Sequence, residues 1–163
     1  MTPHEGGPVI SEYAVSLART VDANAIARMS RDCIEYDLTW KWRAPRVLRN
    51  IADASTNVVV SRDAQGLVGF AMMKYGEQEA HVLLLAVSPA KRRSGVGTGL
   101  MTWLEATART AGLGVIRLEA RCGNACARAF YRKLGYREFA RVHGLYDGVE
   151  DGMRLAKDLW DFA

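Results

Sequence analysis

The chain has 163 residues, a net charge of +4, 49% hydrophobic residues and 25% charged residues. That length suits one compact domain, and this mixture of residues excludes disordered and fibrous proteins. The longest apolar run in the middle of the chain, Val82–Val87, has six residues, whereas a membrane-spanning helix needs about twenty. We therefore expect a soluble protein without a membrane partner. The basic excess is also too small to indicate a nucleic-acid partner.

The cysteine count and the first residues bear on where the protein works. Three cysteines without paired CxxC motifs favour the reducing cytoplasm, with neither a disulfide framework nor a metal site. Residues 1–12 are rich in Gly and Pro, so they predict a flexible arm ahead of one domain over 13–163. Because this arm holds acidic and proline residues where a secretory peptide has an apolar core, no export signal is expected.

Hydrophobic periodicity and turn signals predict the element order β-α-α-β-β-β-α-β-α-β-β. The first helix would follow an N-cap at Thr20 and the second would follow Pro45, with two more over Val96–Ala111 and Ala125–Leu134. Ala80–Val87 is apolar almost throughout, which is typical of a strand buried on both faces. The order favours an α/β (or α+β) fold in which helices cover a mixed sheet. The expected strands are Tyr13–Leu17, Val58–Val60, Leu67–Tyr75, Ala80–Val87, Val115–Arg121, Arg137–His143 and Gly152–Leu159.

A basic, glycine-rich loop follows the strand that ends at Val87. Its sequence is Lys91-Arg92-Arg93-Ser94-Gly95-Val96-Gly97-Thr98-Gly99, and it opens the next helix. Glycines let backbone N–H groups face outward, and the start of a helix adds unsatisfied donors and a positive dipole end. The loop therefore predicts a site for a phosphate-bearing ligand, with the basic side chains supplying formal charge.

Three other interpretations of this loop compete with phosphate binding. The glycines could serve only close packing, with the arginines on a solvated face. A dinucleotide-binding loop has GxGxxG close behind the strand, whereas seven residues separate Val87 from Gly95. A Walker loop needs Gly-Lys-Ser/Thr, which is absent from the sequence.

Two motifs resemble the GCN5-related N-acetyltransferase (GNAT) superfamily. Arg92-x-x-Gly95-x-Gly97 resembles its coenzyme A loop, and Asn124-x-x-Ala127-x-x-Phe130-Tyr131-x-x-Leu134-Gly135-Tyr136 resembles its fourth-helix signature. Within the superfamily, Leu118-Glu119-Ala120-Arg121-x-x-Asn124 resembles the ribosomal-protein alanine N-acetyltransferases. The resemblance implies a mostly antiparallel sheet with strands splayed at the acetyl-CoA site. It also implies direct acetyl transfer from acetyl-CoA, as co-substrate, to a primary amine without a metal.

The resemblance also implies which residues would contact acetyl-CoA. Backbone groups of Leu85, Ala86 and Val87 would pair with the pantetheine arm as an added strand does, and this requires Ala80–Val87 to splay from Val115–Arg121. The backbone N–H of Val87 would also serve the oxyanion. The remaining contacts, to the pyrophosphate and the pantetheine, would come from Arg92, Arg93, Ser94, Gly95, Val96, Gly97, Thr98, Gly99, Asn124, Ala127 and Tyr131.

Acetyl transfer to an amine needs a base and an acid. Tyr131 is the candidate acid, because a phenol of pKa ~10 stays protonated and can donate to a thiolate; its alternative role is that of a core aromatic. Glu119, at the position of the group's catalytic glutamate, is one candidate base, and His81 is the other. Glu119 could instead only pair with Arg117 or Arg121, His81 could cap a strand end, and water could act as the base.

The acceptor site in this superfamily lies between the first two helices and the last hairpin. Here these regions are Glu35–Arg43 and Gly144–Gly152, whose carboxylates would attract a cationic amine or belong simply to exposed turns. The acceptor is expected to be a small amine or a peptide N-terminus, although the peptide-modifying group has paired tyrosines where this chain has Leu145-Tyr146. A non-catalytic coenzyme A sensor or scaffold is the alternative function, and a homodimer stays open.

Overall fold

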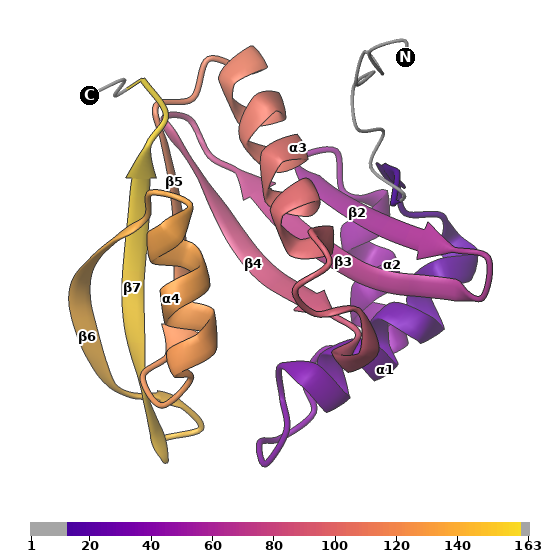
Figure 1. Ribbon diagram of the computed structural model, residues 1–163, viewed down its shortest axis with the longest axis horizontal. Helices are drawn as coiled ribbons and strands as arrows, with labels where there is room; N and C mark the ends of the chain where they lie inside the picture. Colours follow the sequence, from indigo (N-terminus) through magenta and orange to yellow (C-terminus); the bar gives the residue numbers. More distant parts are fainter. Residues whose placement is uncertain (1–12, 161–163) are drawn as a thin grey trace, which may run out of the picture.

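The computed structural model describes residues 13–160, in which seven strands form one sheet in the order β1-β2-β3-β4-β5-β7-β6 (Figure 1). Neighbouring strands are antiparallel except β4 and β5, which are parallel. This confirms the predicted fold class and element order, while the arm predicted over residues 1–12 lies outside the described residues. The strands are β1 Val15–Leu17, β2 Thr56–Asp63, β3 Gly66–Tyr75, β4 Glu79–Val87, β5 Val115–Arg121, β6 Arg137–Tyr146 and β7 Glu150–Asp158.

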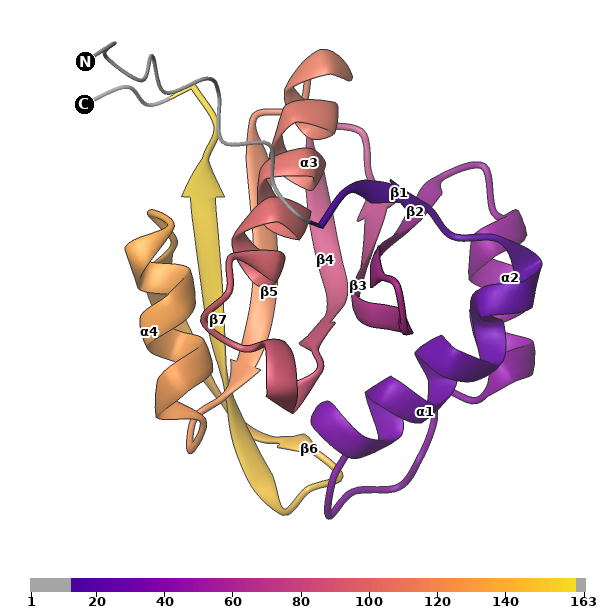
Figure 2. The same ribbon diagram turned by 45° about the vertical axis from the view of Figure 1, so that its right-hand side comes forward.

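Helices cover both faces of the sheet. α1 and α2 pack on one face, and α3 and α4 pack on the other (Figure 2). Within residues 13–160, no helix is long and apolar enough to cross a membrane. The helices are α1 Ala23–Cys33, α2 Ala44–Ala52, α3 Val96–Thr110 and α4 Ala125–Lys133, with short 3₁₀ turns at Thr20–Asp22 and Pro89–Lys91.

The start of the first helix differs from the prediction. Thr20 does not cap α1; it begins the 3₁₀ turn, for which Arg19 is the N-cap. Asp22 accepts a hydrogen bond from the Arg19 backbone N–H at 2.8 Å and two from the Arg62 guanidinium at 2.6 Å each. Because Arg62 lies in β2, forty residues away, local capping signals could not indicate this arrangement.

Two apolar cores lie on opposite faces of the sheet. Leu100 of α3 packs with Ile116 of β5 in one core, and Ile26 of α1, Val47 of α2 and Phe70 of β3 pack in the other. All five side chains are fully buried, and burying a side chain of this size stabilises the fold by about 1.5–3 kcal/mol. The two cores hold α1 and α3 on opposite sides of β4, which is the strand that matters most for the site.

A β-bulge divides β4 into two parts. Val82 pairs with Met73 and Leu84 pairs with Met72, so Leu83 is an extra residue with no partner of its own on β3. Leu83 and Leu84 therefore both pack on the α1–α2 side, and the alternation of the strand is reversed beyond them. The prediction that this strand is buried on both faces holds in part: Ala80 and Val82 are buried on the α3–α4 side and Leu84 and Ala86 on the α1–α2 side, but half-buried residues alternate with them.

The bulge lies at the point where β4 leaves β5. Pairing between the two parallel strands runs from Glu79–Val115 to Val82–Leu118 and stops there. Beyond that point the two strands diverge (Figure 1). β5 instead continues with β7 to its last residue, Arg121. Since a bulge bends its strand and disrupts the ladder, Leu83 explains why the sheet opens here, and the predicted splay is confirmed.

Candidate active site

The opening in the sheet forms a cleft of about 500 Å³. Six segments line it: the end of α1 with the α1–α2 loop, the start of α2, the middle of β4, the end of β5, α4, and the end of β6 with the β6–β7 turn. The cleft contains residues from both segments predicted to bind an acceptor and all three predicted catalytic residues. Those catalytic residues are His81, Glu119 and Tyr131.

Backbone groups of β4 border the opening. The Ser88 N–H donates to the Val68 carbonyl of β3 at 2.8 Å. Since N–H and C=O groups alternate in direction along a strand, those of Ala86 also face β3, where Ala86 pairs with Phe70. The groups of Leu85 and Val87 consequently face the gap that β5 leaves. Leu85 and Val87, two of the three residues predicted to pair with the pantetheine arm, therefore have backbone groups at an unpaired strand edge.

The glycine-rich loop ends where α3 begins. Gly95 is the N-cap with a φ of 88°, a left-handed conformation that glycine adopts without steric penalty. The first intrahelical hydrogen bond runs from Gly99 N to Gly95 O at 2.9 Å. The amides of Val96, Gly97 and Thr98 precede it, as donors at a helix start do. A Cβ on Gly97 would lie 3.2 Å from Phe130 Cζ, so this glycine also permits α3 and α4 to approach.

The basic side chains of the loop differ in their surroundings. Lys91 Nζ lies 3.5 Å from Asp63 Oδ2 and 5.9 Å from the centre of the Tyr13 ring, so its charge is directed toward the β2–β3 turn. Arg92, Arg93 and Ser94 are exposed, although Ser94 Oγ donates to the Lys91 carbonyl. The two arginines, rather than the lysine, therefore have charge available at the start of α3.

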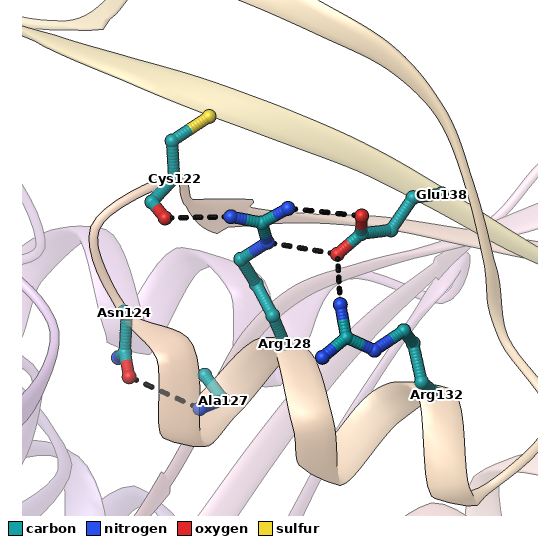
Figure 3. Close-up of polar contacts among 6 residues, drawn as sticks. All are labelled: Cys122, Asn124, Ala127, Arg128, Arg132 and Glu138. Carbon is teal, nitrogen blue, oxygen red and sulfur yellow. Dashed lines mark hydrogen bonds and ion pairs between the residues drawn. The ribbon is translucent and has the colours of Figure 1, made fainter.

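Asn124 is the N-cap of α4 (Figure 3). Its Oδ1 accepts the Ala127 N–H at 3.0 Å, and since a cap uses only the oxygen, the amide NH₂ is left for the cleft that Asn124 also lines. Arg128 fixes the helix: it donates to both Glu138 carboxylate oxygens at 2.8 and 2.9 Å and to the Cys122 carbonyl at 2.9 Å. α4 is thus tied to the turn after β5 and to β6.

Tyr131 is a core aromatic that also lines the cleft. It is 7% exposed, and its ring packs edge-to-face on Phe130 and Tyr136, with centroids 5.2 and 5.9 Å away. Burial first, and then the neighbouring Tyr146, raise the pKa of Tyr131 well above its usual range. The phenol is therefore protonated at neutral pH and can donate a proton. The two roles considered for Tyr131 are compatible.

His81 and Glu119 lie in contact, so the two candidate bases are neighbours. His81 Nε2 is 2.5 Å from Glu119 Oε2, and Glu119 Oε1 lies 3.6 Å from Arg117 Nη1 and 3.9 Å from Arg154 Nε. Burial opposes ionisation of Glu119, but the hydrogen bond and charge of His81 and the two arginines outweigh it and lower the pKa of Glu119. Arg121, suggested as a partner of Glu119, pairs elsewhere.

Arg121 joins the two segments of the acceptor side. This side chain is buried; its Nη2 donates to the Tyr36 carbonyl at 2.6 Å, and its guanidinium lies 3.9 Å from the centre of the Tyr36 ring. On the other side, Arg121 Nε is 3.3 Å from Glu150 Oε2, and the Tyr146 ring is 5.8 Å away. Burial and then the charge of Glu119 raise the pKa of Tyr146, so this phenol is protonated at neutral pH.

A second link between the same segments comes from Asp147. Its Oδ2 accepts the Thr39 N–H at 2.7 Å, and its Oδ1 lies 2.8 Å from Lys41 Nζ. The β6–β7 turn and the α1–α2 loop accordingly lie side by side (Figure 2). Glu150 pairs with Arg121, and Asp151 pairs with Arg141. Three of the carboxylates suggested to attract a cationic amine are thus neutralised by the chain's own cations.

The sequence suggested Arg121 only as a partner of Glu119, and Glu35 only as part of the acceptor segment. Neither residue was predicted to hold the site together. Glu35 is buried and accepts hydrogen bonds from Ser30 Oγ, Lys41 N and Trp42 N, so it shapes the α1–α2 loop. A signal for Arg121 existed, since alternate residues of a strand share one face, and Arg121 lies two residues after Glu119. No comparable pattern marks Glu35, whose partners depend on the path of the loop.

Comparisons with known proteins extend this description. Residues 23–136 match a family model described as "Acetyltransferase (GNAT) family". The catalytic subunit naa20 of the N-terminal acetyltransferase B complex of Schizosaccharomyces pombe is 33% identical over 87 residues, 51% of this chain and 48% of that protein. The chain thus spans about half the length of this relative. The [ribosomal protein bS18]-alanine N-acetyltransferase of Escherichia coli is 28% identical over 71% of this chain and 79% of that protein.

Solved structures resemble the whole fold. Ard1 from Thermoplasma volcanium superposes with a TM-score of 0.81 at 25% identity, over 92% of this chain and 99% of that chain. Chaetomium thermophilum Naa20, crystallised with a bisubstrate analogue, has a TM-score of 0.76 at 25% identity, over 89% of this chain and 86% of that chain. Since the family model matches well over half of the sequence, the chain belongs to the acetyltransferase (GNAT) family.

Proposed function

We propose that the protein is an N-acetyltransferase that moves the acetyl group of acetyl-CoA directly to a primary amine, and that this amine is a peptide N-terminus. Family membership supports acetyl transfer. The naa20 subunit and the bS18-alanine enzyme, both named for acetylation of proteins, support a peptide acceptor. The observation that carries the proposal is the parting of β4 from β5 after Val82–Leu118, because it exposes strand edge inside a cleft lined by Tyr131, His81 and Glu119.

The residues present suit acetyl-CoA. The edge groups of Leu85 and Val87 match an amide-containing arm that pairs as a strand does, with Ala86 holding them in register on β3. At the start of α3, the free amides from Val96 to Thr98 and the cations Arg92 and Arg93 suit a pyrophosphate. The remaining contacts of the proposed site are Ser94, Gly95 and Gly99 in the loop and Asn124, Ala127 and Tyr131 on α4.

The proposed chemistry assigns one task to each group. Acetyl-CoA supplies an acetyl thioester. The His81–Glu119 pair takes the proton of the acceptor amine, because an ammonium has no lone pair with which to attack. The Val87 N–H donates to the carbonyl oxygen as it gains negative charge. Tyr131 gives its proton to the departing thiolate. The second proton that the amine nitrogen loses as the amide forms returns the phenol to its protonated state through solvent.

Glu119 and His81 are proposed to act as one unit. A carboxylate whose pKa is lowered is by itself a weak base for an amine. When Glu119 accepts a hydrogen bond from His81 Nε2–H, it orients the imidazole and stabilises the imidazolium that forms when Nδ1 takes a proton. Proton affinity then belongs to the pair, so no choice between the two residues is needed.

The test is a transfer assay with acetyl-CoA. Peptides with free N-termini and a panel of small amines are incubated with the protein, and free coenzyme A thiol and acetylated product are measured together. We expect thiol release matched by acetylation of peptide α-amines. Binding of acetyl-CoA without thiol release for any acceptor would instead favour the coenzyme A sensor. The protein is proposed to work in the cytoplasm, which its three free cysteines support; its oligomeric state stays a prediction.

A further inference from the structure

We propose that Arg46 selects acceptors that carry a carboxylate close behind the amine, and this inference rests on the proposed peptide N-acetyltransferase function. Arg46, near the start of α2, is half-buried and lines the cleft. Its guanidinium lies over the Trp42 ring at 3.8 Å from the centre. Within residues 13–160, Arg46 makes no ion pair. Arg46 is thus a cation that Trp42 holds in the cleft, and no carboxylate of residues 13–160 neutralises its charge.

The other charges that line the cleft have partners. Lys41 is paired with Asp147, His81 with Glu119, and Arg121 with Glu150. Glu35 is buried, and three hydrogen-bond donors occupy its two oxygens. Of the charged groups in this wall, Arg46 is therefore the one that a ligand could neutralise without breaking an existing ion pair.

The stacking on Trp42 favours a carboxylate as the ligand. A ring stacked on the face of a guanidinium leaves its N–H groups free, since they point outward in the guanidinium plane. This planar fork matches the two oxygens of a carboxylate. Because Trp42 already restricts the side chain, less conformational freedom is lost when such an ion pair forms.

The charge of the surrounding segment points to the same chemistry. From Ala23 to Ala52 the chain has six cationic side chains and three carboxylates. Two of those carboxylates are used internally, because Asp32 pairs with Arg31 and Glu35 holds the loop. Of the six cations only Lys41 and Arg46 line the cleft, and Lys41 is paired with Asp147, so Arg46 is the positive charge that this segment presents to an acceptor. Such a charge attracts an acidic acceptor and disfavours a basic one.

Matched peptides test the inference. One set carries Asp or Glu at the second or third position, and the control set carries Asn or Gln there. For the wild-type protein we expect kcat/KM to be about tenfold higher for the acidic peptides, as suits one charge-assisted contact. In Arg46→Gln this preference is expected to disappear, while kcat/KM for the neutral peptides is retained. Free amino acids are assayed separately, because their own carboxylate would bind the same guanidinium.

Arg43→Gln is the matched control. Arg43 belongs to the same segment and lies over Trp40 at 4.5 Å, but it is exposed and does not line the cleft. It should keep the preference. Three results would each overturn the inference. They are equal kcat/KM of the wild type for both peptide sets, a preference for acidic peptides that persists in Arg46→Gln, and an equal loss of that preference in Arg43→Gln.

Peptide binding separates this inference from the proposed function. Anisotropy of labelled acidic and neutral peptides, measured with coenzyme A present, reports selection even if no acetyl group is transferred. Acidic-peptide binding that depends on Arg46 without turnover would contradict the transferase proposal alone. Turnover of peptides without any Arg46-dependent preference would contradict this inference alone.

Discussion

His81 and Glu119 lie diagonally across β4 and β5, with Nε2 and Oε2 2.5 Å apart. His81 is opposite Arg117, and the next pair, Val82–Leu118, is the last before the strands part. The contact therefore joins the strands at the base of the cleft, on the side of the sheet that α1 and α2 cover. Two residues that looked like rival bases in the sequence form one hydrogen-bonded unit.

Kinetics of Glu119→Gln, His81→Asn and the double variant should show that the pair acts as a unit. Each single variant is expected to lower kcat about 10²-fold, which is within the usual range for a general base. The double variant should lower kcat little further, because residues that act together are non-additive. In each variant the rate should partly recover as pH rises, since more of the free amine is then deprotonated in solution.

Glu79→Gln is the control for this cycle. Glu79 pairs with Arg117 at 2.8 Å on the same two strands but is exposed and absent from the lining of the main cleft. Its removal should leave kcat unchanged. Losses that multiply fully in the double variant would mean that the two groups act independently.

Tyr131→Phe should lower kcat and leave acetyl-CoA affinity nearly unchanged. Phenylalanine keeps the edge-to-face packing with Phe130 and Tyr136 and removes only the hydroxyl, so the fold should be retained. Steady-state rates and calorimetric titration with acetyl-CoA measure the two quantities. Normal turnover in a folded Tyr131→Phe variant would exclude Tyr131 as the acid.

Replacing Arg121 with Gln should raise KM for peptide about tenfold and have little effect on the Kd of acetyl-CoA. The guanidinium holds Tyr36 of the α1–α2 loop and faces Glu150 of the hairpin, and its loss leaves the Tyr36 carbonyl without its donor. Arg141→Gln, which removes an exposed ion pair with Asp151 in the same hairpin, serves as the control. If both variants raise KM equally, the effect belongs to the hairpin and not to Arg121.

The double substitution Arg92→Gln/Arg93→Gln should weaken acetyl-CoA binding about tenfold and reduce its dependence on salt, because two exposed cations at the start of α3 would be lost. Acetyl-pantetheine, which lacks the pyrophosphate, should bind the variant as well as it binds the wild type. Lys91→Gln should have a smaller effect, since Lys91 faces Asp63. Equal weakening for both ligands would place the arginines outside a pyrophosphate site.

Asp22 should make stability depend on pH. Hydrogen bonds from Arg62, opposed by burial, lower the pKa of Asp22 below its usual value. A depressed folded-state pKa contributes stability that is present above the unfolded pKa of ~4 and is lost as pH falls through the folded pKa. Asp22→Asn should therefore destabilise the protein by about 2 kcal/mol at pH 7, the usual size for hydrogen bonds to a charged group, and the difference should shrink below pH ~4.

Urea unfolding at several pH values measures this difference. Asp32→Asn removes the exposed ion pair with Arg31 and should have no measurable effect at any pH, because exposed pairs contribute little. A gap between wild type and Asp22→Asn that stays constant down to pH 3 would contradict the linkage.

Much of the fold was predictable because short-range patterns decide it. The apolar periodicity of Ala80–Val87 and Val96–Ala111 gives a strand and a helix, and Gly95 and Gly97 mark the start of α3. The two motifs around these elements were sufficient to indicate the family. The ends of the last hairpin were harder to predict. β6 extends to Tyr146 and β7 begins at Glu150, but exposed residues there obscure the alternation of apolar and polar side chains.

The sequence by itself determined the order of elements, the family and the identity of the candidate acid and bases, since these depend on residue type and local spacing. Only the tertiary structure decided which of them touch. The bulge at Leu83, the contact between His81 and Glu119, and the position of Arg121 between two segments all arise from pairing between strands far apart in the chain. Such long-range contacts leave no local pattern, because each partner's residue type suits many surroundings equally well.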